Sequence, residues 1–361
     1  MTWPIWLPLR DDLRPLTPYG APQVPAAASL NTNENPYPPS LALQESIIQA
    51  LSHVVLTLNR YPDRDAEKLR TELAAYINES SNTNFRNVNI WAANGSNEII
   101  QSLFLAFGSR TALGFTPSYS MHPLIAKVSG TPWVNGVRNG DFTFNYELAL
   151  KEVTLHKPAL TFITTPNNPT GDSISFNDIA ALADAVGAHG GLLIVDEAYA
   201  EFSSEISAVR LISQKPQVVV VRTMSKAFAF AGARIGYLVA DPVVIDAMKL
   251  VRLPYHLSAL TQAAALVALD FRADLLKRVA TLIASREVLA QELNNLGLIT
   301  LPSSANFILF TGFNAPAPQL WSQLLKEGVL IRDVGLSSFL RVTVGTDAEN
   351  KAFLQALTKL L

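Results

Sequence analysis

The 361-residue sequence contains no cysteine. This absence excludes disulfide bonds, a thiolate nucleophile and thiolate metal ligands. A chain without cysteine suits a reducing compartment, so we expect a cytoplasmic protein. Its histidines show no spacing typical of metal ligands, and we expect no metal site.

The sequence also lacks an excess of positive charge and a long apolar run. Its 28 basic and 30 acidic residues give a formal net charge of −2, and no basic stripe suits a nucleic-acid backbone. The longest apolar segment, residues 257–269, is interrupted by polar side chains and is shorter than the roughly 20 residues that span a membrane. Prolines near the N-terminus interrupt any signal-peptide core. We expect no nucleic acid and no membrane among the partners.

Hydrophobic residues make up 49% of the chain, which is enough for a large core. Residues 1–40 are rich in proline, which prevents regular helices, and they carry aromatic side chains that need a surface to bury them. We therefore predict that residues 1–40 form an ordered arm lying over the active site.

Short apolar runs alternate with helical patterns in the middle of the chain. The runs lie at residues 89–93, 112–115, 159–164, 192–195 and 218–221. This alternation predicts an α/β fold with a mostly parallel sheet flanked by helices, and it puts ligand sites at the carboxyl ends of the strands. After Pro254 the pattern changes to long helices followed by short strands and a final helix. We predict a large domain at residues 41–255 and a smaller α+β domain at residues 256–361.

Polar side chains follow the first four predicted strands. Residues 94–97 open a helix, where free backbone N–H groups of Ser96 and Asn97 can bind an anion, although a simple turn has the same pattern. Tyr119 could stack on a planar ring or pack in the core. Asn168 lies between two prolines. The fourth strand leads to Asp196 and Tyr199, and a buried carboxylate at position 196 needs a cationic partner.

The fifth strand leads to Thr223, Ser225 and Lys226, with Arg234 eight residues later. A partly desolvated lysine among other cations loses proton affinity, so its amine can attack a carbonyl and form a Schiff base. Taken alone, Lys226 could equally be a solvated loop lysine. Together the five strand ends offer an amine for an aldehyde, an acid for a ring nitrogen, donors for a ring oxygen, a stacking aromatic and a phosphate cradle. Pyridoxal 5′-phosphate requires these groups.

Six motifs occur in a fixed order along the chain. They are LNTNENPY at 30–37, RYPD at 60–63, NPTG at 168–171, DEAY at 196–199, SKAF at 225–228 and LRVTVG at 340–345. In this order they resemble the fold-type I pyridoxal-phosphate aminotransferases, and among these the histidinol-phosphate aminotransferase family, over essentially the whole length. The resemblance implies a large domain with a mixed, mostly parallel sheet and a smaller α+β domain.

The resemblance implies roles for the residues at the strand ends. Lys226 would bond to the cofactor's aldehyde and later move a proton, Asp196 would pair with the pyridinium nitrogen, and Tyr199 with Asn168 would bind the ring oxygen. Tyr119 would stack on the ring. The cofactor's phosphate would be held by five residues, Ser96, Asn97, Thr223, Ser225 and Arg234.

The resemblance also implies the reaction and the assembly. The enzyme would convert imidazole acetol phosphate and L-glutamate to L-histidinol phosphate and 2-oxoglutarate in histidine biosynthesis. Tyr61 would reach into the neighbouring subunit's site, which implies a homodimer. Arg341 would bind the substrate's α-carboxylate, while Arg332 and Tyr19 would bind its phosphate, and Asn168 would lie near the substrate. We assign no role to His256.

Alternative functions remain at this stage. An aromatic (phenylalanine or tyrosine) aminotransferase would use Arg341 but not a second anion site, and a threonine-phosphate decarboxylase would use the same cofactor to release carbon dioxide. A cofactor-sensing transcription regulator would need a DNA-binding domain, which a short proline-rich arm does not supply. A hydrolase that used Ser225 and Lys226 would leave Asp196 and Arg234 without a purpose.

Overall fold

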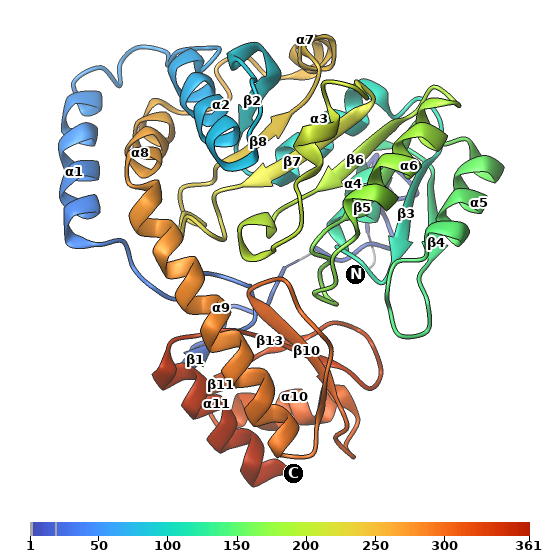
Figure 1. The fold of residues 1–361 in the computed structure, drawn as a ribbon, viewed down its shortest axis with the longest axis vertical. Coiled ribbons are helices and arrows are strands. Elements are labelled where there is room, and N and C mark those ends of the chain that lie inside the picture. The colour runs from blue at the N-terminus through green and yellow to red at the C-terminus, as the bar shows by residue number, and fades with distance from the viewer. Residues whose placement is uncertain (1–2, 19) are drawn as a thin grey trace.

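The computed structural model describes residues 3–18 and 20–361 (Figure 1). Tyr19, which we expected to contact the substrate, lies outside the described residues. Within them, no helix is long and apolar enough to cross a membrane.

The largest sheet has seven strands in the order β2-β8-β7-β6-β5-β3-β4. The strands are β2 (Ile90–Ala93), β3 (Ala112–Thr116), β4 (Trp133–Val137), β5 (Leu160–Thr164), β6 (Leu192–Asp196), β7 (Val218–Thr223) and β8 (Gly236–Val239). Neighbours in this sheet are parallel, except that β8 runs antiparallel to both β2 and β7. The prediction of a mostly parallel α/β sheet is confirmed.

Helices cover both faces of this sheet because its central strands are apolar on both sides. In β7, Val218 and Val220 belong to the core under one face, while Val219 and Val221 belong to the core under the other. The first face is covered by α2 (Glu67–Ser81), α5 (Tyr146–His156) and α6 (Phe176–Gly187). The second is covered by α3 (Ser96–Phe107), α4 (Met121–Ser129) and α7 (Pro242–Val251).

The C-terminal part of the chain forms a four-stranded antiparallel sheet in the order β12-β13-β10-β9. Its strands are β9 (Ile299–Thr300), β10 (Phe307–Thr311), β12 (Arg332–Asp333) and β13 (Leu340–Thr343). The helices α10 (Ala317–Lys326) and α11 (Asp347–Leu360) share a separate core with this sheet. The helix α11 begins with a capping box in which Thr346 and Glu349 satisfy each other's backbone N–H groups.

The long helix α9 (Arg272–Asn295) connects the two sheets (Figure 1). Before it, α8 (Ala259–Asp270) lies beside α1 (Leu41–Val55) and packs into the core of the large sheet. The first half of α9 contributes to the same core through Leu282, whereas Leu289 contributes to the core of the small sheet. The apolar side chains of α8 therefore belong to the core of the large sheet, and the two cores meet along α9.

The N-terminal arm contacts the rest of the chain at several places, two of which lie away from the cavity described below. Arg10 donates hydrogen bonds to the carbonyl oxygens of Lys127 and Val128 at the end of α4. Farther along, β1 (Ala28–Ser29) pairs in parallel with β11 (Val329–Leu330) near the small sheet. Three short 3-10 turns complete the described elements, at Asn87–Asn89, Ala200–Phe202 and Ala208–Leu211.

Candidate active site

A cavity of about 480 Å³ lies where the carboxyl ends of the large sheet, the small sheet and the arm meet. Its lining includes every described site residue expected from the sequence except Tyr61. The structure thus brings together these residues: Ser96, Asn97, Tyr119, Asn168, Asp196, Tyr199, Thr223, Ser225, Lys226, Arg234, Arg332 and Arg341. The arm adds four lining residues in the segment 31–34.

The residues expected to form an anion cradle lie around the start of α3. Ser96 is the first helical residue, so the unpaired backbone N–H groups of the first turn are available to a ligand. The guanidinium of Arg234 lies so close to Gly95 that a Cβ at position 95 would be 2.6 Å from it, and Gly95 has a φ of +83°. The hydroxyl of Thr223 donates to that of Ser225 at 3.0 Å. Only glycine allows this approach of the guanidinium to the helix start.

Lys226 lies between the large sheet and the arm. Its Nζ donates a hydrogen bond to the carbonyl oxygen of Thr32 at 2.9 Å. Burial lowers the pKa of Lys226 to about 8, with a further decrease from Arg341 and Arg234 and an opposing increase from Glu34. A larger share of neutral amine is therefore present near neutral pH than for an ordinary lysine.

Asp196 is paired with a histidine that we did not predict. Both side chains are buried, and Nε2 of His122 lies 3.0 Å from Oδ2 of Asp196. The other carboxylate oxygen accepts the backbone N–H of Ala198 at 3.2 Å. An ionised carboxylate can only accept hydrogen bonds, so Nε2 of His122 carries the hydrogen when Asp196 is charged. The only sequence signal for this pairing was that His122 follows Tyr119 by one helical turn. In the structure the ring of His122 packs edge-on against that of Tyr119.

Besides Thr32, the arm supplies partners for two further residues of the cavity. Asn33 donates to the hydroxyl of Tyr199 at 2.9 Å, and the carbonyl of Asn31 accepts from Arg341 at 2.7 Å. Arg341 also donates to Oδ1 of Asn168. Both arm residues lie in the first sequence motif, but nothing in the sequence told which atoms they contact.

Two arginines of the small sheet face each other in register. Arg332 on β12 and Arg341 on β13 are direct cross-strand partners, and both line the cavity. Like charges opposite each other on adjacent strands are unfavourable on their own. An anion bound beside both guanidinium groups would offset this repulsion, so the pair is a candidate for a second anion site, carried by a different sheet from the helix start at Gly95.

Tyr61 and His256 lie outside the cavity. Tyr61 is 80% exposed, and its ring stacks on that of Tyr255. The imidazole Nε2 of His256 lies 2.9 Å from the carbonyl oxygen of Ala92. The backbone oxygen of His256 accepts a hydrogen bond from Asn94, directly before the cradle.

Comparison with known proteins agrees with this geometry. Residues 27–357 match the family model for aminotransferase class I and II. The chain belongs to this family. Within it, the aminotransferase is 53% identical to a histidinol-phosphate aminotransferase from Mycobacterium sp. strain JLS over 358 residues, 98% of this chain and 94% of that protein. It is 54% identical to a histidinol-phosphate aminotransferase from Mycolicibacterium vanbaalenii over 358 residues, 98% of this chain and 96% of that protein.

A solved structure has the same fold as this aminotransferase. It is the histidinol-phosphate aminotransferase from Sinorhizobium meliloti in complex with pyridoxal-5′-phosphate. The TM-score is 0.84 at 24% sequence identity, covering 93% of this chain and 91% of that chain. At this identity the likeness concerns the fold, and the chemistry has to be argued from the residues of the cavity.

Proposed function

We propose that this aminotransferase uses pyridoxal 5′-phosphate to transfer the amino group of L-glutamate to imidazole acetol phosphate. The products are L-histidinol phosphate and 2-oxoglutarate, a step of histidine biosynthesis. The relatives that are more than half identical over nearly the whole chain carry the corresponding name. The observation that carries the proposal in the structure is the second anion site of Arg332 and Arg341 in the cavity that contains Lys226.

The cradle fits the phosphate of the cofactor. It combines helix N–H groups, the hydroxyls of Thr223 and Ser225 and the cation of Arg234, and the close approach to Gly95 leaves no room for a larger residue. These are the donors that a phosphate prefers. When bound, pyridoxal phosphate supplies a conjugated ring that accepts electrons from the substrate's reacting carbon.

With the cofactor bound, Lys226 would be the amine beside its aldehyde, and Nζ would take the proton from the reacting carbon of the substrate. Asp196 would hold the proton on the ring nitrogen, and His122, 3.0 Å from the carboxylate, would keep that carboxylate oriented. The hydroxyl of Tyr199 and the amide of Asn168 would hold the ring oxygen, and Tyr119 would lie against the ring.

The two arginines of the small sheet bind the anionic ends of the substrates. Arg341 binds the α-carboxylate of glutamate as a bidentate partner, with Asn168 beside it. Arg332 completes the site for the phosphate of imidazole acetol phosphate, which carries more negative charge than a carboxylate. The arm, whose residues 31–34 line the cavity, lies over the substrate.

The enzyme works as a cytoplasmic homodimer in which Tyr61 contributes to the partner subunit's cofactor site. Exposed apolar side chains at Leu41, Ile48 and Val55 support self-association, because their spacing of seven residues puts them on one side of α1. We also propose that the large domain extends from α1 into α9 and that the small domain begins within that helix, since the core changes there.

The lowered pKa of Lys226 predicts how cofactor loading depends on pH. Only the neutral amine attacks an aldehyde, so the rate at which cofactor-stripped protein takes up pyridoxal phosphate should rise with pH through about 8. Stopped-flow absorbance from pH 6 to roughly pH 11.5 measures this. Replacement Arg341→Met removes the largest charged contribution and should move the midpoint upward. A wild-type midpoint near 10.5, the ordinary value of a lysine, would contradict the assignment.

Arg332 is tested by substrate comparison. The wild type should convert imidazole acetol phosphate with a much higher kcat/KM than phenylpyruvate, which has no phosphate. Loss of a charge-assisted contact costs about 1.5–3 kcal/mol, so Arg332→Ala should lower kcat/KM for imidazole acetol phosphate roughly 10- to 100-fold. The loss for glutamate should be smaller. Equal losses for both substrates would remove Arg332 from the phosphate site, and a preference for phenylpyruvate would favour the aromatic aminotransferase.

A further inference from the structure

The ring of Tyr61 is fixed from one side although the residue is exposed. Its centroid lies 4.4 Å from that of Tyr255, with an interplanar angle of 17°. Tyr61 is 80% exposed and Tyr255 is 41% exposed, so the stack stands at the protein surface. Pro62 follows directly and restricts the backbone of Tyr61 to extended conformations. The side chain is thus held in one direction before any partner molecule contacts it.

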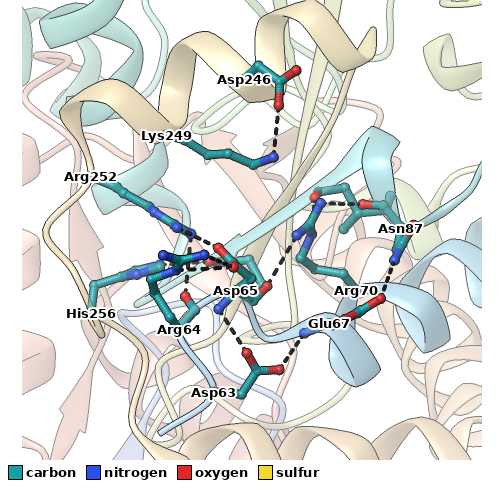
Figure 2. Close-up of polar contacts among 12 residues, drawn as sticks. Asp63, Arg64, Asp65, Glu67, Arg70, Asn87, Asp246, Lys249, Arg252 and His256 are labelled. Carbon is teal, nitrogen blue, oxygen red and sulfur yellow. Dashed lines mark hydrogen bonds and ion pairs between the residues drawn. The ribbon is translucent and has the colours of Figure 1, made fainter. Parts of the chain in front are cut away.

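The loop that carries Tyr61 is also attached by charge. Figure 2 shows the Asp65 carboxylate between the guanidinium groups of Arg64 and Arg252, and Arg252 also donates to the carbonyl oxygen of Arg64. The side chain of Arg252 is 10% exposed, so this ion pair is screened less than a surface pair. The two arginines, with Arg64 the stronger, lower the pKa of Asp65 to about 2. The carboxylate therefore stays charged throughout the working pH range.

A third attachment lies at the start of α8. The side chain of Gln262 donates to the carbonyl oxygen of Asp63 at 2.9 Å, and the Asp63 carboxylate accepts backbone N–H groups of Asp65 and Glu67. Figure 2 shows the two contacts of the Asp63 carboxylate below the Asp65 cluster. The loop at residues 60–66 is thus held by the segment 252–262 as well as by its own helix.

The segment 252–256 is strained where it meets Tyr61. Tyr255 has a φ of +58°, a left-handed conformation that is unusual for an aromatic residue. Such a conformation costs about 1–3 kcal/mol and persists only where its surroundings hold it. Here the next residue, His256, is held on both sides, by the carbonyl of Ala92 and by Asn94. The strained backbone turns the Tyr255 ring toward Tyr61.

We propose that Arg252 and Tyr255 are positioning residues that hold Tyr61 for the cofactor site of the partner subunit. The inference rests on the proposed function, in which Tyr61 serves the neighbouring site. A tyrosine on an exposed loop loses conformational freedom when it binds, and fixing it beforehand lowers this cost. Arg252 and Tyr255 therefore position Tyr61 within their own chain, but they change cofactor binding in the active site of the partner subunit.

Hybrid dimers separate the two sites. One arrangement pairs a Lys226→Ala chain with a chain that carries Arg252→Met. Only one active site of this hybrid keeps its lysine, and we call it the live site. It has Lys226 from the Arg252→Met chain and Tyr61 from the chain with an intact Arg252. The reverse arrangement puts Lys226→Ala and Arg252→Met in one chain and pairs it with a wild-type chain, so the live site receives its Tyr61 from the altered loop. The same pair of hybrids is made with Tyr255→Leu, and two affinity tags isolate each hybrid.

Both arrangements contain the same substitutions, so only their distribution differs. In the first, the cofactor Kd and kcat per live site should equal those of a wild-type and Lys226→Ala hybrid. In the second, loss of one oriented hydrogen bond to a charged group should raise the cofactor Kd roughly tenfold. The matched control is Arg272→Met, which breaks a surface ion pair with Glu79, and it should change neither hybrid.

A raised cofactor Kd or a lowered kcat in the first arrangement and not in the second would overturn the inference. It would show that the substitution acts on the active site of its own chain. Tyr61→Phe tested in the same hybrids separates this failure from failure of the proposed function. If Tyr61→Phe acts in trans and Arg252→Met and Tyr255→Leu do not, the positioning role is wrong. If Tyr61→Phe itself shows no trans effect, the shared site is wrong and the inference falls with it. Tyr255 is a surface residue, so its variant keeps the test valid should Arg252→Met fold poorly.

Discussion

Replacement Lys226→Ala should abolish transamination. Without Nζ no covalent bond to the aldehyde forms and no base lies beside the reacting carbon, so we expect kcat to fall by roughly 10⁴-fold or more, at the upper end of general-base effects. The cradle around Gly95 and Arg234 is unchanged, so the protein should still bind the cofactor, but without a covalent link.

The measurement combines turnover with a test for the covalent link. Wild-type protein treated with borohydride should retain the cofactor after denaturation, as seen by mass spectrometry, and the Lys226→Ala protein should lose it. Lys359→Ala, which removes a surface lysine paired with Glu327, is the control and should behave as wild type. Turnover that survives in the Lys226→Ala protein would refute the mechanism.

Replacement Asp196→Asn should produce the second-largest loss. The carboxylate is buried and pairs with His122. Under the proposed function, its charge would keep the ring nitrogen of the cofactor protonated. Breaking a buried charge pair costs about 3–5 kcal/mol, which corresponds to roughly 10²- to 10⁴-fold in kcat. Asparagine has nearly the same shape as aspartate but no charge, so the decrease in kcat reports the electrostatic contribution of the carboxylate.

The variant should still carry covalently bound cofactor, because Lys226 and the cradle do not depend on the carboxylate. Turnover and borohydride trapping therefore give opposite results for Asp196→Asn, whereas both fail for Lys226→Ala. Asp184→Asn removes a surface carboxylate that pairs with Lys215, and it should leave kcat unchanged. If Asp196→Asn retains wild-type kcat, the carboxylate does not hold the ring proton.

The strand ends could be predicted because each follows a short, fully buried apolar run. The run at Val218–Thr223 shows this, since apolar residues on both faces and a polar end define both the strand and the position of Lys226. Two strands of the same sheet were missed. The strand Trp133–Val137 lies at the edge and is only partly buried, so its sequence alternates poorly. The strand Gly236–Val239 is short, and its antiparallel place between β2 and β7 depends on long-range pairing.

Contacts between residues far apart in the chain could not be predicted either, because they also depend on long-range pairing. His122 and Asp196 are 74 residues apart and meet only because the sheet brings α4 beside β6. The cross-strand pairing of Arg332 with Arg341 depends on the register of β12 and β13, which no local pattern specifies. The sequence did not specify which sheet α8 would pack on, and in the structure α8 lies beside α1 and contributes to the core of the large sheet.

Under the proposed function, the single cavity that holds Lys226, Arg332 and Arg341 also constrains the order of events in a catalytic cycle. Glutamate and imidazole acetol phosphate would both bind beside Lys226, so they would compete for one place and could not be present together. Glutamate must leave as 2-oxoglutarate before imidazole acetol phosphate binds, and the amino group stays on the enzyme between the two steps. We therefore expect a double-displacement mechanism with parallel double-reciprocal plots. An excess of either substrate should inhibit the half-reaction of the other substrate.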